Sequence, residues 1–271
     1  MHHSTPPTAL TIAGSDSGGG AGAQADLKTF AAHRVHGTSA LTAITAQNTA
    51  QVRAVETLAP SFVRAQIETV LADFAVRSVK TGMLATAGIV AEVAALAAAG
   101  QLPNLVVDPV LVSSSGHALM DPAGVDAYLT LLLPHALVAT PNLREAAVLS
   151  GTTVEQLMDT EAMAAVAEQI RASGVHYVVV KGGHLTESAA DVVAGPAGIT
   201  VLPGDRVATT NDHGTGCSLS AAIAANLARG ADVLDAVREA KAFVARALAG
   251  AAGWELGSGH GPIDHFGWSY T

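Results

Sequence analysis

The chain reads Asn211-Asp212-His213-Gly214-Thr215-Gly216-Cys217-Ser218 and continues into a run of small apolar residues that reaches Leu227. This pattern predicts a helix that begins at a glycine-rich turn, with the single cysteine of the chain in its first turn. The two glycines let backbone N–H groups face one point, and the helix dipole adds partial positive charge there. The stretch therefore predicts an anion site beside a thiol or, alternatively, a tight turn before a core helix with an inert cysteine.

Short runs rich in Val, Ile, Leu and Thr alternate with longer alanine-rich runs along the chain, without a linker between them. This alternation is typical of βαβ units around a mostly parallel sheet, and it predicts one α/β domain over residues 1–271, with residues 1–7 flexible. A turn at 203–205 is expected to close a hairpin. The predicted strands are 9–13, 37–44, 53–58, 78–81, 105–107, 136–139, 176–180, 190–194 and 198–202. The predicted helices are 21–34, 61–72, 87–99, 122–132, 143–150, 160–172, 216–228 and 233–251.

Composition limits the class of protein. The 271 residues are 49% hydrophobic and 14% charged with a formal net charge of −9, which argues against disorder and against nucleic-acid binding. One cysteine cannot form an intrachain disulfide, which fits a reducing compartment. We find no secretory signal and no apolar run of about 18 residues, so the sequence predicts a cytoplasmic protein without a membrane span.

Polar residues and glycines follow most of the predicted strands directly. The carboxyl ends of parallel strands lie along one edge of a sheet, where ligands bind in the crevice at a topological switch point. This one-sided placement favours a ligand-binding enzyme whose site lies at that edge. The residues in question are Gly14, Gln47, Met83, Asp108, Asn142 and Lys181.

Three of these strand ends have side chains that suit magnesium and phosphate. Asn142 and Glu145 are three residues apart and can face the same side of a starting helix. Together with Asp108 they supply the oxygen ligands that suit Mg²⁺ and nucleotide phosphates, and Lys181 with the two glycines that follow it fits a phosphate chain. Each also has a structural alternative, as a helix N-cap, a first-turn acid or a strand-end charge.

Other chemistries find less support in the sequence. The glycines at 18–20 belong to neither a Walker motif nor a G-x-G-x-x-G motif, and Asp26 in the next helix is explained equally well as a solvated first-turn carboxylate. No H-E-x-x-H or G-x-S-x-G pattern is present, and one cysteine cannot build a thiolate zinc site. We therefore expect neither zinc nor a serine hydrolase site.

The order of motifs along nearly the whole chain resembles the hydroxymethylpyrimidine/phosphomethylpyrimidine kinases of thiamin biosynthesis, which belong to the ribokinase-like superfamily. This resemblance implies a three-layer α/β ribokinase-like fold, with a central mostly parallel sheet flanked by helices. It also implies transfer of the γ-phosphoryl group of ATP to 4-amino-5-hydroxymethyl-2-methylpyrimidine and then to the resulting monophosphate, in a homodimer. The motifs are Ala13-Gly14-Ser15-Asp16, residues 24–28, Thr45-Ala46-Gln47-Asn48-Thr49, residues 80–84, Asp108-Pro109-Val110, Thr140-Pro141-Asn142 with Glu145, residues 181–184, His213 to Cys217, and residues 261–266.

The same resemblance implies roles for individual residues. Substrate binding falls to Gln47, which contacts the aminopyrimidine edge, and to Gly14, Asp26, Met83 and Val110. ATP binding falls to Asp108, Asn142, Lys181 and Thr210, with Asp108 and Glu145 as Mg²⁺ ligands. The anion hole and the general base fall to Gly214, Thr215, Gly216 and Cys217.

Cys217 needs its own argument as a base, because many members of the superfamily carry Asp at this place. A thiol with an ordinary pKa near 8.5 is only about 3% thiolate at pH 7. A helix N-terminus can lower that pKa, so we expect a thiolate fraction that approaches one half. Asp212 also departs from the family, where Thr is common, and it adds a carboxylate near the expected phosphate site.

Two other functions fit much of the same sequence. A pyridoxal-type kinase would share the fold, ATP, the metal and Cys217, although the Gln47 amide, which both donates and accepts, favours the aminopyrimidine. A pyrimidine sensor or a scaffold without catalysis is the alternative from a different class. The joint presence of the acidic, amide, lysine and cysteine residues argues against it.

Overall fold

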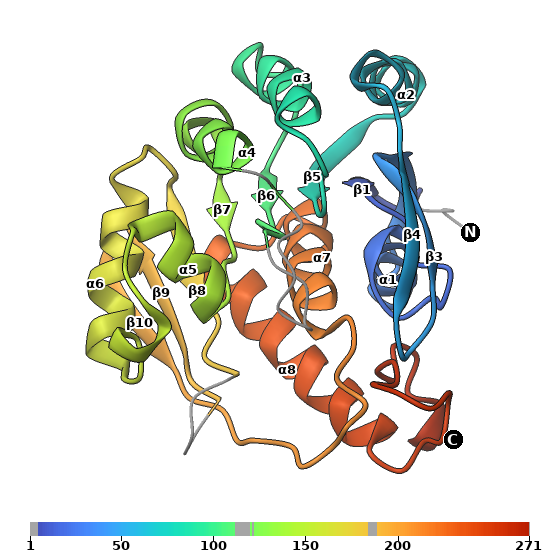
Figure 1. The fold of residues 1–271 in the computed structure, drawn as a ribbon, viewed down its shortest axis with the longest axis vertical. Coiled ribbons are helices and arrows are strands. Elements are labelled where there is room, and N and C mark those ends of the chain that lie inside the picture. The colour runs from blue at the N-terminus through green and yellow to red at the C-terminus, as the bar shows by residue number, and fades with distance from the viewer. Residues whose placement is uncertain (1–4, 112–119, 121, 184–188, 271) are drawn as a thin grey trace.

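A computed structural model describes residues 5–111, 120, 122–183 and 189–270. Within these residues the centre is an eight-stranded sheet in the order β10-β9-β8-β7-β6-β5-β1-β2 (Figure 1). All pairs from β2 across to β8 are parallel, and β9 and β10 join antiparallel at the edge. The strands are β1 Thr8–Ala13, β2 His36–Leu41, β5 Val76–Thr81, β6 Leu105–Val107, β7 Val138–Ala139, β8 Tyr177–Val180, β9 Asp191–Gly195 and β10 Gly198–Leu202.

Helices cover both faces of this sheet. Consecutive strand residues point to opposite faces, so Ala9 packs in one apolar cluster and Leu10 in the other. The cluster with Ala9 contains residues of α1 (Gly22–Ala32), α7 (Thr215–Ala228) and α8 (Val233–Ala251). The cluster with Leu10 contains residues of α2 (Pro60–Asp73), α3 (Ala87–Ala98), α4 (Pro122–Ala127), α5 (Leu143–Ser150) and α6 (Thr160–Arg171). The predicted three-layer fold is confirmed.

The predicted strand over residues 37–44 is wrong, because the chain leaves the main sheet after Leu41. Thr42 turns it away: its backbone N–H donates to the Ala13 carbonyl and its hydroxyl donates to the Met83 carbonyl. The chain then forms a separate antiparallel pair, β3 (Ala43–Gln47) with β4 (Val52–Thr57), which runs along one side of the molecule in Figure 1. This pair carries Gln47 at its end.

Two further predictions need correction. The predicted helix over 122–132 is α4 followed by a π-helical segment, Tyr128–Leu132, and a 3-10 turn, Leu133–His135, where the proline in the turn lacks a helical N–H. The predicted hairpin turn at 203–205 is also wrong. The hairpin lies between β9 and β10, where Gly198 has φ 104°, and within the described residues no strand follows β10. Two short 3-10 turns complete the described elements, Val154–Gln156 and Trp268–Tyr270.

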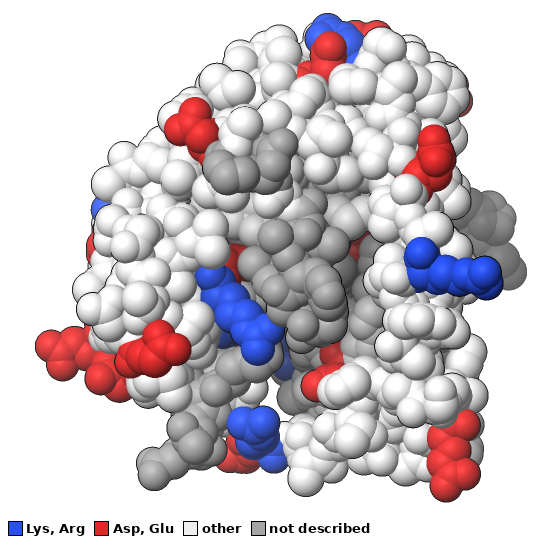
Figure 2. Space-filling view, in the orientation of Figure 1, with Lys and Arg blue, Asp and Glu red and all other residues white. Residues whose placement is uncertain are grey.

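Some predictions fall outside the described residues. These are the first four residues of the expected flexible segment and His184 of the motif that begins at Lys181. Within the described residues, no helix is long and apolar enough to cross a membrane. On the face that Figure 2 shows, the lysines and arginines of the described residues are scattered and form no continuous basic patch.

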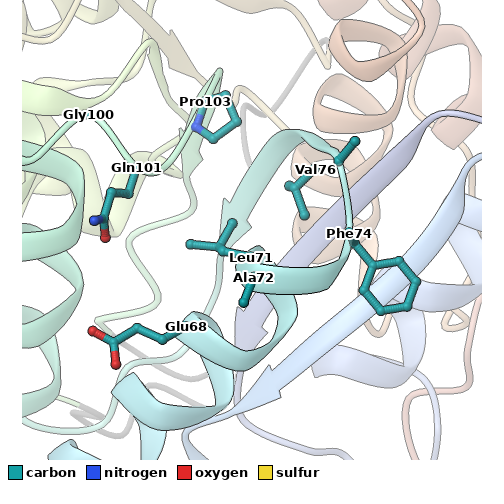
Figure 3. A pocket seen from close by; sticks show the side chains of 9 residues that line it. Glu68, Leu71, Ala72, Phe74, Val76, Gly100, Gln101 and Pro103 are labelled. Atoms are coloured by element: carbon teal, nitrogen blue, oxygen red, sulfur yellow. The ribbon is translucent and has the colours of Figure 1, made fainter.

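An open hollow of about 540 Å³ lies at the amino edge of the sheet (Figure 3). Val76, the first residue of β5, lines this hollow together with Leu71 of α2 and Phe74, which follows α2. Glu68 is the one ionisable side chain among the described residues that line it. The polar residues that the sequence singles out lie at the opposite, carboxyl edge, so we place the candidate site there.

Candidate active site

The site begins at the N-terminus of α7. Gly214 caps the helix in the left-handed conformation with φ 84°, and a Cβ atom there would overlap the carbonyl oxygen of Gly20. The Thr215 hydroxyl donates to the Asp212 carbonyl at 2.6 Å and fixes the turn. The helix is buried from Ser218 to its end, so its positive terminus is held firmly against the glycine-rich loop.

Replacing Gly214 with alanine should therefore affect both fold and activity. The side chain would force the loop and the helix start apart, and we expect a loss of about 2–4 kcal/mol in the free energy of unfolding. Displaced N–H donors should lower kcat by about 100-fold. Urea unfolding and steady-state kinetics measure the two effects.

Gly230→Ala is the matched control for this change. Gly230 follows the other end of α7 with φ 92°, but a Cβ atom there would meet nothing within 4 Å. The Gly230→Ala variant should therefore show the destabilisation that an alanine causes at positive φ, but it should keep its activity. Equal activity losses in the two variants would contradict an anion site at Gly214.

Asp108 and Lys181 meet beside this helix start. Asp108 follows β6 and is 2% exposed, and its Oδ1 lies 2.9 Å from Nζ of Lys181, which follows β8. Burial by itself opposes both charges, but the pair holds the pKa of Asp108 below its usual value and the pKa of Lys181 above its own. A Cβ atom on Gly216 would lie 3.2 Å from Lys181 Nζ, which places the ammonium group at the first turn of α7. The ion pair of Asp108 with Lys181 therefore lies next to the predicted anion hole at the start of α7.

Asn142 and Glu145 form a capping box at the start of α5. The Asn142 side chain accepts from the Glu145 N–H at 3.0 Å, and the Glu145 carboxylate accepts from the Asn142 N–H at 2.8 Å. The helix-cap alternative is therefore real for both residues. Asn142 also pairs with Lys181 as an isolated β-bridge, which brings the cap next to the ion pair.

The acidic residues at this edge fit a divalent cation. Glu145 is 3% exposed, and burial raises its pKa to about 8, with Lys181 opposing and Asp108 adding to the rise. Burial and the nearby Asp108 carboxylate thus favour the protonated form of Glu145. A divalent cation bound between the two groups would favour the ionised form and be held by both carboxylates. Within the described residues no group of three or more His, Cys, Asp or Glu forms a complete metal site. Mg²⁺ is usually bound through one or two carboxylates, with water and phosphate oxygens as its other ligands, so two carboxyl groups would suffice.

Cys217 lies half-buried in the first turn of α7. Burial raises the pKa of its thiol to about 11, although Lys80 opposes the rise. This raised pKa contradicts the expected thiolate fraction near one half at pH 7. Loss of water around the sulfur, together with the charges of Asp108 and Asp26, outweighs the charge of Lys80 and a hydrogen bond with the backbone of Gly22, which both favour the thiolate.

Asp26 lies inside the protein rather than on the wall of the site. It is fully buried, both of its oxygens lie 2.9 Å from Lys80 Nζ, and the Thr11 hydroxyl donates to it at 2.6 Å. It is neither the solvated carboxylate of the simpler interpretation nor free to contact a substrate as the resemblance implies. The fully buried Lys80 is its partner, a pairing across 54 residues that the sequence did not indicate.

Of the residues expected around the pyrimidine, Gly14, Met83 and Val110 follow strands at the carboxyl edge of the main sheet, while Gln47 lies in the separate β3–β4 pair. Gly14 donates its N–H to the Met83 carbonyl at 3.2 Å, and a Cβ atom on Gly14 would lie 2.5 Å from Met83 Cε. Val110 follows Asp108 and is half-buried. Gln47 lines a small hollow of about 300 Å³ at the end of β3. Thr210 is exposed in the coil before α7, and its role at the nucleotide stays a prediction.

Sequence reasoning missed the centre of the glycine-rich loop, Asp16. Its side chain accepts from the N–H groups of Gly18, Gly20 and Ala21 at 2.8, 3.0 and 2.8 Å, and it lies 2.9 Å from Nε2 of His213. An aspartate just before three glycines is the signal that could have indicated it, because a carboxylate can accept several N–H groups of a following turn. Asp16 thus connects the loop after β1 to the start of α7.

His265 supports the helix from the opposite side. Its Nε2 lies 2.9 Å from the Ser218 hydroxyl, and burial, with a smaller effect from Lys28, lowers its pKa to about 4. In the unfolded chain a histidine has a pKa near 6.5. The unfolded state therefore binds a proton between these values while the folded state does not, so this contribution to stability is complete above pH 6.5 and is lost as the pH falls towards 4.

His265→Gln should remove that pH dependence. We expect the free energy of unfolding of the unchanged protein to fall by up to about 3 kcal/mol more than that of the variant between pH 7.5 and 4.5. Urea unfolding at the two pH values measures the difference, with the exposed His260→Gln as the control. Parallel pH profiles for the unchanged protein and H265Q would contradict the assignment.

Comparison with known proteins shows the family of this chain. The profile of a family described as phosphomethylpyrimidine kinase matches residues 16–264. A Rhizobium meliloti protein named hydroxymethylpyrimidine/phosphomethylpyrimidine kinase is 50% identical over 260 residues, which is 95% of this chain and 96% of that protein.

Solved structures of two kinases share the fold of this chain. The ADP complex of Bacillus subtilis pyridoxal kinase has a TM-score of 0.89 at 39% identity and covers 96% of this chain and 98% of that one. The phosphomethylpyrimidine kinase of Clostridium difficile 630 has a TM-score of 0.78 at 40% identity and covers 89% of this chain and 99% of that one. The chain therefore belongs to the phosphomethylpyrimidine kinase family and has the ribokinase-like fold.

Proposed function

We propose that this protein uses ATP to phosphorylate 4-amino-5-hydroxymethyl-2-methylpyrimidine and then its monophosphate, as a step of thiamin biosynthesis. The observation that carries the proposal is the pairing of Asp108 with Lys181 beside the N-terminus of α7, at the carboxyl edge of the main sheet. Gln47, at the end of the separate β3–β4 pair, approaches the same helix start through its contact with His213 at 3.4 Å. The names of the relatives support the substrate, and the ADP complex of a structural neighbour supports the nucleotide.

The charges at this edge suit phosphoryl transfer, in which catalysis is mostly positioning and electrostatic stabilisation. The start of α7 and the Lys181 ammonium group would bind the transferred phosphoryl group and its neighbouring oxygens. Asp108 and Glu145 would hold Mg²⁺, which supplies neutralising charge to the phosphates when bound. Thr140 donates to Asp108 Oδ1 at 3.2 Å, so the carboxylate is held in one orientation.

Cys217 would accept the proton of the substrate hydroxyl in the first reaction. The thiol must itself be ionised to do so, and its high pKa makes the active fraction small near pH 7. The second acceptor is a phosphate monoester with a second pKa near 6, which is already anionic at neutral pH and needs no base. The two steps therefore make different demands on Cys217 within one site.

A coupled ATP-consumption assay with the pyrimidine alcohol, its monophosphate and pyridoxal tests the proposal. We expect turnover of the first two, with a higher kcat/KM than for pyridoxal. A preference for pyridoxal would favour the second candidate function, which the likeness to a pyridoxal kinase at TM-score 0.89 supports. Tight pyrimidine binding without turnover would indicate a sensor instead. A homodimer and a cytoplasmic location stay predictions.

A further inference from the structure

His213 makes contacts that the mechanism above does not use. Its Nε2 lies 2.9 Å from Asp16 Oδ2 and 3.4 Å from the side-chain nitrogen of Gln47. One ring nitrogen cannot donate to a carboxylate and at the same moment accept from an NH2 group, because it either carries a proton or offers a lone pair. Nε2 of His213 therefore cannot accept from Gln47 while it donates to Asp16, and one of the two partners must determine whether this nitrogen carries the proton.

Asp16 decides it. Its carboxylate is 2% exposed and already accepts three backbone N–H groups. Burial alone would raise its pKa, but the hydrogen bond from His213 and those from the backbone hold the pKa below the usual value. An ionised carboxylate only accepts, so Nε2 of His213 carries the proton and donates to it.

The histidine ring is also held in place. The His213 N–H donates to the Gly261 carbonyl at 3.0 Å, and the residue pairs with Pro262 as an isolated bridge. On the other side the ring lies against Gly20, where a Cβ atom would approach its Cδ2 to 2.5 Å. The side chain is 17% exposed. The proton on Nε2 thus has a fixed position and direction.

With Nε2 as a donor, the Gln47 group that faces it has to be the amide oxygen, which takes the longer branch of a bifurcated hydrogen bond whose shorter branch goes to Asp16. The oxygen and nitrogen of a glutamine exchange places by a half turn that hardly changes the shape of the side chain. We propose that His213 is a positioning residue that anchors the Gln47 oxygen, so that the Gln47 NH2 group faces the substrate ring. The oxygen keeps a second lone pair for the substrate, so the amide offers one donor and one acceptor side by side.

This inference rests on the proposed function and narrows it to substrate recognition. An aminopyrimidine presents a ring nitrogen beside an amino group, which matches a donor beside an acceptor. Pyridoxal does not present that pair. His213 would therefore act on the discrimination between the two ring types rather than on phosphoryl transfer itself.

The test compares His213→Leu with His260→Leu. His260 Nδ1 lies 2.7 Å from Asp212 Oδ1, so it is also a histidine paired with an aspartate, next to His213 in sequence. His260 is exposed, however, and has no contact with Gln47 in the described structure. We expect His213→Leu to raise KM for the pyrimidine alcohol about tenfold with kcat changed less than about threefold, and to lower the pyrimidine-to-pyridoxal ratio of kcat/KM about tenfold. His213→Gln, which keeps a donor, should recover part of the ratio, and H260L should not change it.

The outcomes separate this inference from the proposed function. If the pyrimidine is not phosphorylated, the proposed function is wrong. If Gln47→Ala leaves the KM for the pyrimidine unchanged, Gln47 does not recognise the substrate. If Gln47→Ala raises KM but His213→Leu leaves the ratio unchanged, the role of His213 alone is overturned. Nitrogen-15 NMR of the unchanged protein decides the case even where H213L does not fold: the proton must reside on Nε2, and a ring protonated only on Nδ1 overturns the inference.

Discussion

Replacing Cys217 with alanine is expected to lower phosphorylation of the pyrimidine alcohol by about 100-fold or more, and that of the monophosphate by less than about tenfold. The alcohol must lose a proton during transfer, whereas the monophosphate is already anionic. Separate assays with the two acceptors measure the difference. Equal losses for both acceptors would assign Cys217 to charge stabilisation or packing rather than to proton transfer.

The pH profile gives an independent readout of the same role. Burial raises the pKa of Cys217 to about 11, so its thiolate fraction grows as the pH rises from 7 towards that value. The rate of the first step should rise with pH over this range, the rate of the second step should not, and C217A should lose the rise. A first step independent of pH in the unchanged protein would argue against the thiolate as base.

Replacing Asp108 with asparagine should lower both steps by about 1,000-fold, because both need the same metal and phosphate charges. The change removes a carboxylate from the proposed Mg²⁺ site and leaves the Lys181 ammonium group without its partner at 2.9 Å. The apparent Mg²⁺ requirement should rise together with the loss of kcat. Steady-state kinetics over a range of Mg²⁺ concentrations measures both effects.

Asp191→Asn is the matched control. Asp191 pairs with Lys241 at 2.7 Å, is similarly buried, and stands at the start of β9. It should lose stability in thermal unfolding as D108N does, but keep its dependence on Mg²⁺. If D108N retained the Mg²⁺ dependence of the unchanged protein, Asp108 would be a structural partner of Lys181 and not a metal ligand.

The periodicity of the sequence predicts most of the helices and strands. The bounds of β6, β10, α5 and α8 agree with the predicted ranges, since each is a local run with a clear start and stop. The one-sided placement of polar residues after strands likewise predicted where Asp108 and Lys181 would meet. The run over 37–44 failed because its apolar pattern continues through Thr42, and only the hydrogen bonds of Thr42 to Ala13 and Met83 divide it between two sheets.

The sequence by itself predicted the alternation of strands and helices around a mostly parallel sheet and the sheet edge at which polar residues gather, because these depend on patterns within a few neighbouring residues. The three layers and the residues for the pyrimidine followed from the resemblance to a family. Only the tertiary structure decided which groups are buried and which atoms pair. Three features depend on residues far apart in the chain. They are the raised pKa of the Cys217 thiol, the ion pair of Asp26 with Lys80, and the contacts of His213 with Asp16 and Gln47. Burial and charge pairing depend on those distant neighbours, so no local pattern could reveal them.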